Sequence, residues 1–142
     1  MEWQTVTRNM LQSADTFRAF YNECLANAVE QSGLPRIEME ILLFLFHHPD
    51  MNTACEICRQ KHFAKSHVSK ALKNLEAAGL VSRSIDRSNL KLHNLKLEES
   101  ASPYIELGLA GQKEFARRIT SVLNDQQLAQ LEFLLSSICR SV

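Results

Sequence analysis

The segment from Ala64 to Ala78 constrains the fold of this 142-residue chain more than any other. Its apolar residues recur at steps of three and four, which is the spacing of a helix with one buried face. The buried positions are predicted to be Val68, Ala71, Leu72, Leu75 and Ala78. The opposite face carries hydroxyl, imidazole and amino groups, on Lys65, Ser66, His67, Ser69, Lys70 and Lys73. The segment therefore predicts an amphipathic helix whose exposed face suits an anionic partner.

The neighbouring segments turn this helix into part of a winged helix-turn-helix. A short helix is expected from Ala54 to Gln60, capped by Asn52 or Thr53, with Ala54, Ile57 and Cys58 on its inward face. After the stop at Gly79, two strands are expected over residues 80–85 and 90–97. Asp, Ser and Asn at the tip between them favour a hairpin turn. A helix that follows a helix-turn and carries phosphate-binding donors is typical of a DNA recognition helix.

Long helices are predicted on both sides of this lobe. The first runs from Thr5 to Gln31, and a strongly apolar helix follows from Pro35 to His48. Near the other end, a helix over residues 104–123 is weakened by Gly108 and Gly111, and a last helix begins after a capping box of Asn124 and Gln127. The fold class is thus mainly α (α+β). The expected domains are an N-terminal dimerisation helix (1–33), a winged helix-turn-helix lobe (34–98) and C-terminal dimerisation helices (99–142).

The apolar stripes of the two end segments predict a homodimer. Taken singly, each end would leave much apolar surface in contact with water, and packing against a second copy would bury it. A two-fold dimer also places two recognition helices one turn of DNA apart. The alternative is that both ends cover a single monomeric core.

The charge of the chain is neutral as a whole and basic in one region. The chain has 16 basic and 16 acidic residues, but eight basic and only two acidic residues lie between Arg59 and Lys91. Such an asymmetry indicates a local anion-binding surface, although chance clustering on a solvated face is the plainer alternative. The candidate DNA-binding residues are Lys65, Ser66, His67, Ser69, Lys70, Lys73, Arg83, Arg87 and Lys91.

In the order and spacing of these segments, the chain resembles the MarR family of winged-helix regulators over nearly its full length. The segments that carry the resemblance are residues 41–50, 65–70, 75–81 and 123–128. The resemblance implies a homodimer on an inverted-repeat operator, with the recognition helix in the major groove and Arg87 at the wing tip reaching the minor groove. Many members are repressors that are released by a small ligand or by thiol oxidation.

The chain departs from the family pattern in two places. The wing tip is short, with Asp86-Arg87-Ser88-Asn89 in place of a longer Asp- and Arg-rich run. In addition, Ala64 stands where the family often has a serine cap, and the loss of such a cap costs about 1 kcal/mol. The resemblance also places an effector pocket between the dimer helices and the lobe. Phe17, Arg18 and Tyr21 are candidates for its lining, although they equally fit an ordinary amphipathic helix.

The cysteines do not indicate a metal site. Cys55 and Cys58 with His62 and His67 lack the spacing of a zinc finger, so we expect neither metal nor cofactor. Thiol sensing is the less favoured alternative to buried structural thiols. Cys24 lies next to Glu23 and shows no basic neighbourhood that would activate it.

No motif of an enzyme is present, and no apolar run approaches the ~20 residues that a membrane span needs. The chain also lacks a signal-peptide pattern, which predicts the cytoplasm. We therefore expect a homodimeric, sequence-specific DNA-binding regulator, a repressor on a pseudo-palindromic operator, with a small-molecule effector as a further expected partner. The alternative is a winged-helix protein-interaction module that has lost specific DNA binding.

Overall fold

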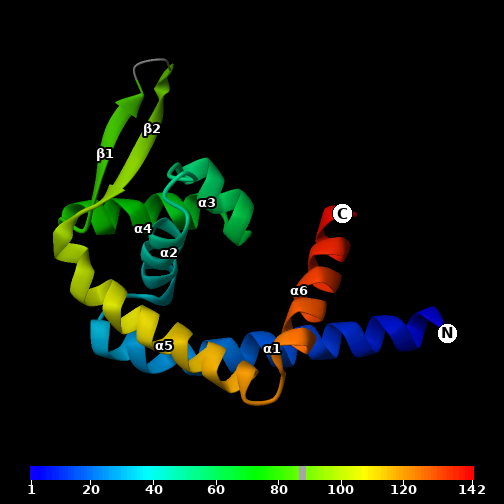
Figure 1. The fold of residues 1–142 in the computed structure, drawn as a ribbon. Coiled ribbons are helices and arrows are strands. Elements are labelled where there is room, and N and C mark those ends of the chain that lie inside the picture. The colour runs from blue at the N-terminus through cyan, green and yellow to red at the C-terminus, as the bar shows by residue number, and fades with distance from the viewer. Residues whose placement is uncertain (87–88) are drawn as a thin grey trace. The chain divides into compact units, whose positions relative to one another are not determined.

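The computed structural model describes the backbone of residues 1–86 and 89–142 and the side chains of residues 1–85 and 93–142. Figure 1 shows mainly helices and one two-stranded hairpin, as the sequence predicts. In chain order the elements are α1 (Trp3–Ser32), α2 (Arg36–His47), α3 (Ala54–Lys61), α4 (Lys65–Ala77), β1 (Val81–Asp86), β2 (Asn89–Leu97), η1 (Glu99–Ala101), α5 (Ser102–Thr120) and α6 (Asp125–Arg140). None of the described helices is long and apolar enough to cross a membrane.

The chain divides into two compact units. One, called the lobe below, is Leu25–Ala110, and the other, called the helical unit, combines Met1–Cys24 with Gly111–Val142. Every buried apolar side chain of the described residues lies between Leu25 and Ile105, and therefore in the lobe. The hydrophobic effect thus stabilises the two units very unequally within a single chain.

The core of the lobe is built on α2. Met39, Ile41 and Leu42 of this helix are fully buried, and Val68 and Leu72 of α4 are fully buried as well. Helix α2 is apolar around most of its circumference, which is the pattern of a helix covered on all sides. The buried faces of α2 and α4 together fix the position of the exposed face of α4.

Gly108 allows α5 to lie very close to α2. A Cβ atom added at Gly108 would lie 2.8 Å from both Leu43 Cδ2 and Met39 Sδ. The sequence marks this glycine as a weak point of the helix, because glycine costs about 1 kcal/mol relative to alanine in a helix interior. The packing gives a reason for a glycine there: the Leu43 and Met39 side chains would have to shift to admit a Cβ atom.

The ends of the helices follow the capping rules. Thr53 caps α3, since its Oγ1 accepts a hydrogen bond of 3.2 Å from the Glu56 backbone N–H. Asn124 and Gln127 form the predicted capping box of α6. Helix α4 begins after Ala64 without any side-chain cap. The predicted starts of all three helices are confirmed, and the missing cap of α4 is a real feature of its first turn.

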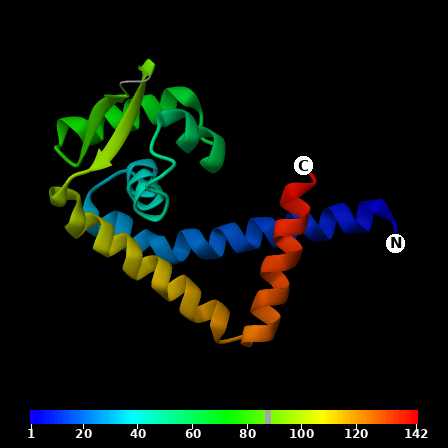
Figure 2. The ribbon, with the colours of Figure 1, turned by 45° about the horizontal axis from the view of Figure 1, so that its top comes forward.

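The hairpin of β1 and β2, called the wing below, is antiparallel. Its register pairs Val81 with Leu97 and Arg83 with Leu95. Val81 and Leu95 are buried, so one face of the wing base belongs to the core. The Leu95 backbone N–H donates a 2.7 Å hydrogen bond to the Asn52 carbonyl, which fastens the loop before α3 to the edge of β2. Figure 2 shows this part of the lobe from a second direction.

The predicted burial of Ala78 is wrong, and two predicted inward-facing residues of α3 are only half-buried. Ala78 is exposed, because α4 ends at Ala77 and Ala78 is already the C-cap residue. In α3 only Ile57 is buried, whereas Ala54 and Cys58 are half-buried. Helix α3 has eight residues, and so short a helix directs few side chains into the core.

Candidate nucleic-acid interface

The six candidate residues of α4 share one exposed surface, called the α4 face below. Val68, Ala71, Leu72 and Leu75 are buried on the opposite side, at the helical spacing that the sequence shows. Because these four side chains anchor the helix to α2, the polar side is held outward on a rigid support. All members of the α4 face are exposed: Lys65, Ser66, His67, Ser69, Lys70 and Lys73.

The structure sorts the basic residues of this region into two classes. Arg59, Lys61 and Arg83 each form an ion pair with a carboxylate. Among the residues that the structure describes, the amino groups of the three lysines of the α4 face have no ion-pair partner. Among the described side chains between Arg59 and Lys91, the lysine and arginine groups without an ion-pair partner thus all lie on α4, which sequence counting alone did not reveal.

Two buried carboxylates of α2 hold the neighbouring helices. Glu40 is 7% exposed and receives Lys61 of α3, with 2.8 Å between Nζ and Oε2. Glu38 accepts a 3.3 Å hydrogen bond from the Asn74 amide of α4. A buried carboxylate requires such a partner, because its desolvation is costly. Sequence reasoning missed both residues, since a Glu-x-Glu pattern inside an apolar helix does not specify its partners.

The candidates on the wing are placed less completely. Arg83 lies on β1, and its Nε donates a 2.6 Å hydrogen bond to Glu76 Oε1 of α4. Arg87 lies outside the described residues, and Lys91 lies on β2 with its side chain outside them. The proposed reach of Arg87 into a minor groove therefore stays a prediction.

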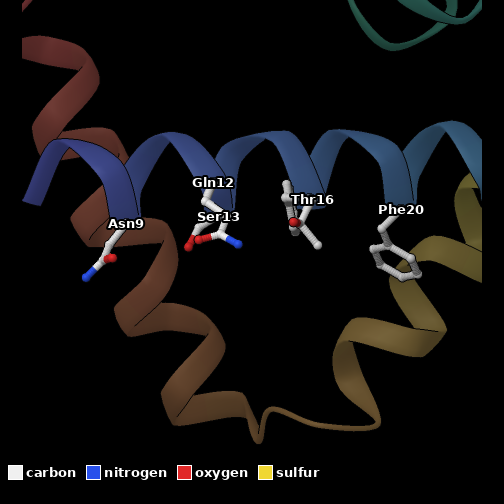
Figure 3. A pocket seen from close by; sticks show the side chains of 6 residues that line it. Asn9, Gln12, Ser13, Thr16 and Phe20 are labelled. Carbon is white, nitrogen blue, oxygen red and sulfur yellow. The ribbon is translucent and has the colours of Figure 1, made fainter. Parts of the chain in front are cut away.

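The helical unit contains an open groove of about 550 Å³ that is lined by one side of α1. Asn9, Gln12, Ser13, Thr16 and Phe20 project from that side, and Phe17 completes the lining (Figure 3). Phe17, Phe20 and Tyr21 also surround Phe115, with ring centroids 5.1 to 5.3 Å apart. Such edge and tilted contacts stabilise aromatic clusters.

The expected surroundings of Cys24 are wrong. Arg118 donates from Nη1 to Cys24 Sγ at 4.0 Å, and its guanidinium also lies over the Phe20 ring at 4.5 Å. The sequence analysis did not bring Arg118 to Cys24, because the two residues are 94 positions apart. The expectation of buried thiols also fails for Cys55 and Cys139, which are exposed.

In α5, two hydrogen bonds from Arg117 hold the pKa of the Glu114 carboxyl below its usual value, and the same contact raises the pKa of Arg117. Among the described residues, no cluster of three or more His, Cys, Asp or Glu side chains could hold a metal ion. The α4 face itself is a positively charged, exposed surface of the lobe.

Comparison with known proteins places this fold. A sequence model of the MarR family matches residues 34–93. A search of curated proteins finds no match. Solved structures that are similar to this chain cover its whole length. The MepR–DNA complex of S. aureus has 20% identity and a TM-score of 0.70, with 99% of its own chain covered. The transcriptional regulator BldR of Sulfolobus solfataricus has 14% identity and a TM-score of 0.77, with 100% of its chain covered.

The YusO protein of Bacillus subtilis adds a third full-length match, with 19% identity, a TM-score of 0.57 and 100% of both chains covered. At these identities the structures establish a shared fold, and the family match identifies the sequence pattern of the lobe. The match lies on α2, α3, α4 and the first part of the wing, which includes the α4 face. The sequence of residues 34–93 is thus similar to the MarR family, and the full length of the chain shares the mainly helical fold of the MepR and BldR structures.

Proposed function

We propose that this protein is a homodimeric, sequence-specific DNA-binding regulator that places α4 in the major groove of a pseudo-palindromic operator. The α4 face carries this proposal: three lysines without ion-pair partners among the described residues, together with three hydrogen-bonding side chains, stand on a helix whose other side is fixed in the core. The similar MepR was crystallised with DNA, which supports the same use of the fold here.

The residues of the α4 face have different roles in this proposal. Lys65, Lys70 and Lys73 bind phosphates, which gives affinity but no sequence information. Ser66, His67 and Ser69 offer donors and acceptors to base edges, where sequence is read. Arg87 and Lys91 of the wing add contacts to the neighbouring backbone or minor groove, as the family resemblance implies.

The helical unit supports the dimer. None of its residues is buried, although its helices carry large apolar side chains. Trp3 is 72% exposed, Phe133 is 65% exposed and Ile138 is 57% exposed. An exposed apolar stripe along α6 is costly in water and suits a second copy of the same helix.

The role of the dimer as a repressor, and its release by a small-molecule effector, are supported by the family resemblance alone. A dimer that occupies an operator blocks access of the transcription machinery to the promoter. Such a regulator works in the cytoplasm, where its DNA lies. The groove on α1 is one place where an effector could be sought, because it offers both polar and aromatic side chains.

Selection of genomic fragments by the purified protein at ~150 mM salt tests this proposal, because non-specific binding is weak there. The expected result is a pseudo-palindrome with half-sites about ten base pairs apart. A triple variant Lys65→Gln, Lys70→Gln and Lys73→Gln removes the charges of the α4 face and should recover no DNA fragment above background. Failure of the unaltered protein to bind any duplex, even at low salt, would instead support a protein-interaction module.

A further inference from the structure

Arg83 and Glu76 join the recognition helix to the wing. Glu76 lies in the last turn of α4 and Arg83 lies on β1, with 2.6 Å between Arg83 Nε and Glu76 Oε1. Both side chains are about one third accessible, at 32% for Arg83 and 28% for Glu76. The contact is therefore shielded in part from solvent and still open to substitution.

The position of Glu76 is unfavourable without this partner. A negative charge in the last turn of a helix meets the negative end of the helix dipole. The same carboxylate also lies on the helix that presents the lysines of the α4 face, where it would repel DNA phosphates. Arg83 compensates both effects, since its guanidinium neutralises the carboxylate at short range.

The contact between Glu76 and Arg83 also lies close to the short connection between α4 and the wing. Only three residues, Ala78, Gly79 and Leu80, separate α4 from β1, and Gly79 turns the chain there with a φ of +74°. Among the described residues, the bonds of Arg83 to Glu76 and of Leu95 to Asn52 are the last hydrogen bonds or ion pairs that tie the wing to the rest of the lobe. Arg83 and Leu95 face each other in the register of the wing.

Beyond that register position, no hydrogen bond or ion pair of the described residues joins the wing to the rest of the lobe. Ser84 and Ile85 are exposed, and Ile85 is 56% exposed. β1 continues from Arg83 to Asp86, about 10 Å further at the usual rise of about 3.3 Å per residue. An isolated two-stranded hairpin is only marginally stable, so its direction depends on where it is braced. Figure 1 shows both strands extending past α4 in this direction.

We propose that the Glu76–Arg83 ion pair is a brace that sets the direction of the wing relative to α4, and that Arg83 is a positioning residue rather than a phosphate ligand. The effect of this ion pair on DNA binding rests on the proposed DNA-binding function, because it requires the wing and α4 to contact the same duplex. The sequence predicted that Arg83 binds DNA directly, whereas this proposal gives Arg83 a role in holding the wing.

The test compares Arg83→Gln, Glu76→Gln and the exchanged pair Glu76→Arg/Arg83→Glu with the unaltered chain. The exchanged pair keeps the net charge and restores an ion pair, and its arginine suits the last turn of α4. Arg59→Gln is the matched control. Arg59 also pairs with a carboxylate at 2.6 Å, but its partner Glu56 lies on the same helix. The control therefore removes a paired arginine without releasing the wing.

The first readout is hydrogen exchange of the free protein. We expect amides over residues 82–96 to exchange about fivefold faster in Arg83→Gln and Glu76→Gln, from the usual strength of a partly exposed pair. The exchange rates of the α4 amides should not change. In the exchanged pair and in Arg59→Gln, the wing amides should exchange as slowly as in the unaltered chain. Unchanged wing exchange in Arg83→Gln would overturn the brace.

The second readout is binding to a random-sequence duplex as a function of salt. Arg83→Gln should bind about fivefold more weakly with an unchanged salt slope, and the exchanged pair should bind normally. A slope that falls by about one in Arg83→Gln, with no rescue by the exchanged pair, would make Arg83 a phosphate ligand and refute its role as a positioning residue. If the unaltered chain binds no duplex, the proposed function fails, while hydrogen exchange still decides whether the brace exists.

Discussion

At the scale of single residues, the α4 face separates affinity from specificity. Lys70 and His67 are both exposed on the same helix, but only the lysine carries a permanent charge. A lysine ammonium acts as a point charge on the phosphate backbone, whereas an imidazole offers directed hydrogen bonds. The two residues should therefore affect DNA binding in measurably different ways.

Substitution of these two residues tests that separation. Lys70→Ala should weaken binding to every duplex and lower the salt slope by about one, because one phosphate contact is lost. His67→Ala should leave the slope unchanged and cost about 1–3 kcal/mol at the selected operator alone. Fluorescence titration of operator and random duplexes at matched salt measures both effects. An equal loss for His67→Ala on all sequences would exclude a readout role for His67.

A second residue-scale effect concerns Gly108. Alanine would improve the helix propensity of α5 by about 1 kcal/mol, but its Cβ would overlap the buried side chains of Leu43 and Met39. Overpacking of a core costs about 1–3 kcal/mol, so we expect Gly108→Ala to be destabilising by about 1 kcal/mol. Gly108→Val should cost more. Urea unfolding measures both variants, and a more stable alanine variant would mean that the two core side chains move aside easily.

At the scale of elements, the two helices of the helix-turn-helix differ in how they are held. Helix α4 is anchored by four buried side chains but lacks a cap, whereas α3 has a cap and only one buried side chain. For α3 the Thr53 cap and the ion pair of Lys61 with Glu40 therefore carry a larger share of its stability. A short helix with little core contact depends on such polar end contacts.

Removal of the cap of α3 and addition of a cap to α4 test this difference. Thr53→Ala should destabilise the protein by about 1 kcal/mol, because the N–H of Glu56 loses its acceptor. Ala64→Ser should stabilise it by about 0.5–1 kcal/mol by supplying the cap that α4 lacks. The shift of the urea midpoint at constant m-value reports both changes. No gain from Ala64→Ser would show that water already satisfies the first amides of α4.

At the scale of the whole molecule, the distribution of burial is the main feature. The lobe holds every buried apolar side chain of the described residues, and the helical unit holds none. Amphipathic helices in proteins owe most of their stability to the packing of their apolar face rather than to helix propensity. A second copy of the chain is the partner that would bury their apolar stripes and also provide a second recognition helix.

Charge on the stripe of α6 should break this assembly. Leu134→Glu with Ile138→Glu introduces two carboxylates at side chains that are 52% and 57% exposed in the single chain. We expect light scattering to report a dimer for the unaltered protein and a monomer for this variant at micromolar concentration. Ala129→Glu with Ser136→Glu adds the same charge to exposed positions on another side of α6 and should leave the dimer intact. A monomeric unaltered protein would contradict the proposed assembly.

Much of the fold was predictable because it depends on neighbours in the chain. The spacing of apolar residues placed α1, α2 and α4. The residues at the turns placed the stop at Gly79 and the capping box of α6, and narrowed the cap of α3 to Asn52 or Thr53. Helical periodicity and capping act over three or four residues, so a single sequence contains all the information that they need.

The sequence by itself therefore determined which elements form and which side of α4 is exposed. The tertiary structure decided which charges remain available on that side. The sequence does not show which basic residues have a partner. After folding, Lys61 contacts Glu40, Arg83 contacts Glu76, and Arg118 contacts Cys24. Glu40 and Cys24 lie 21 and 94 positions from their partners, and the close approach of Gly108 to α2 is equally non-local. Such contacts depend on how whole elements pack, and no local pattern of residues specifies that packing.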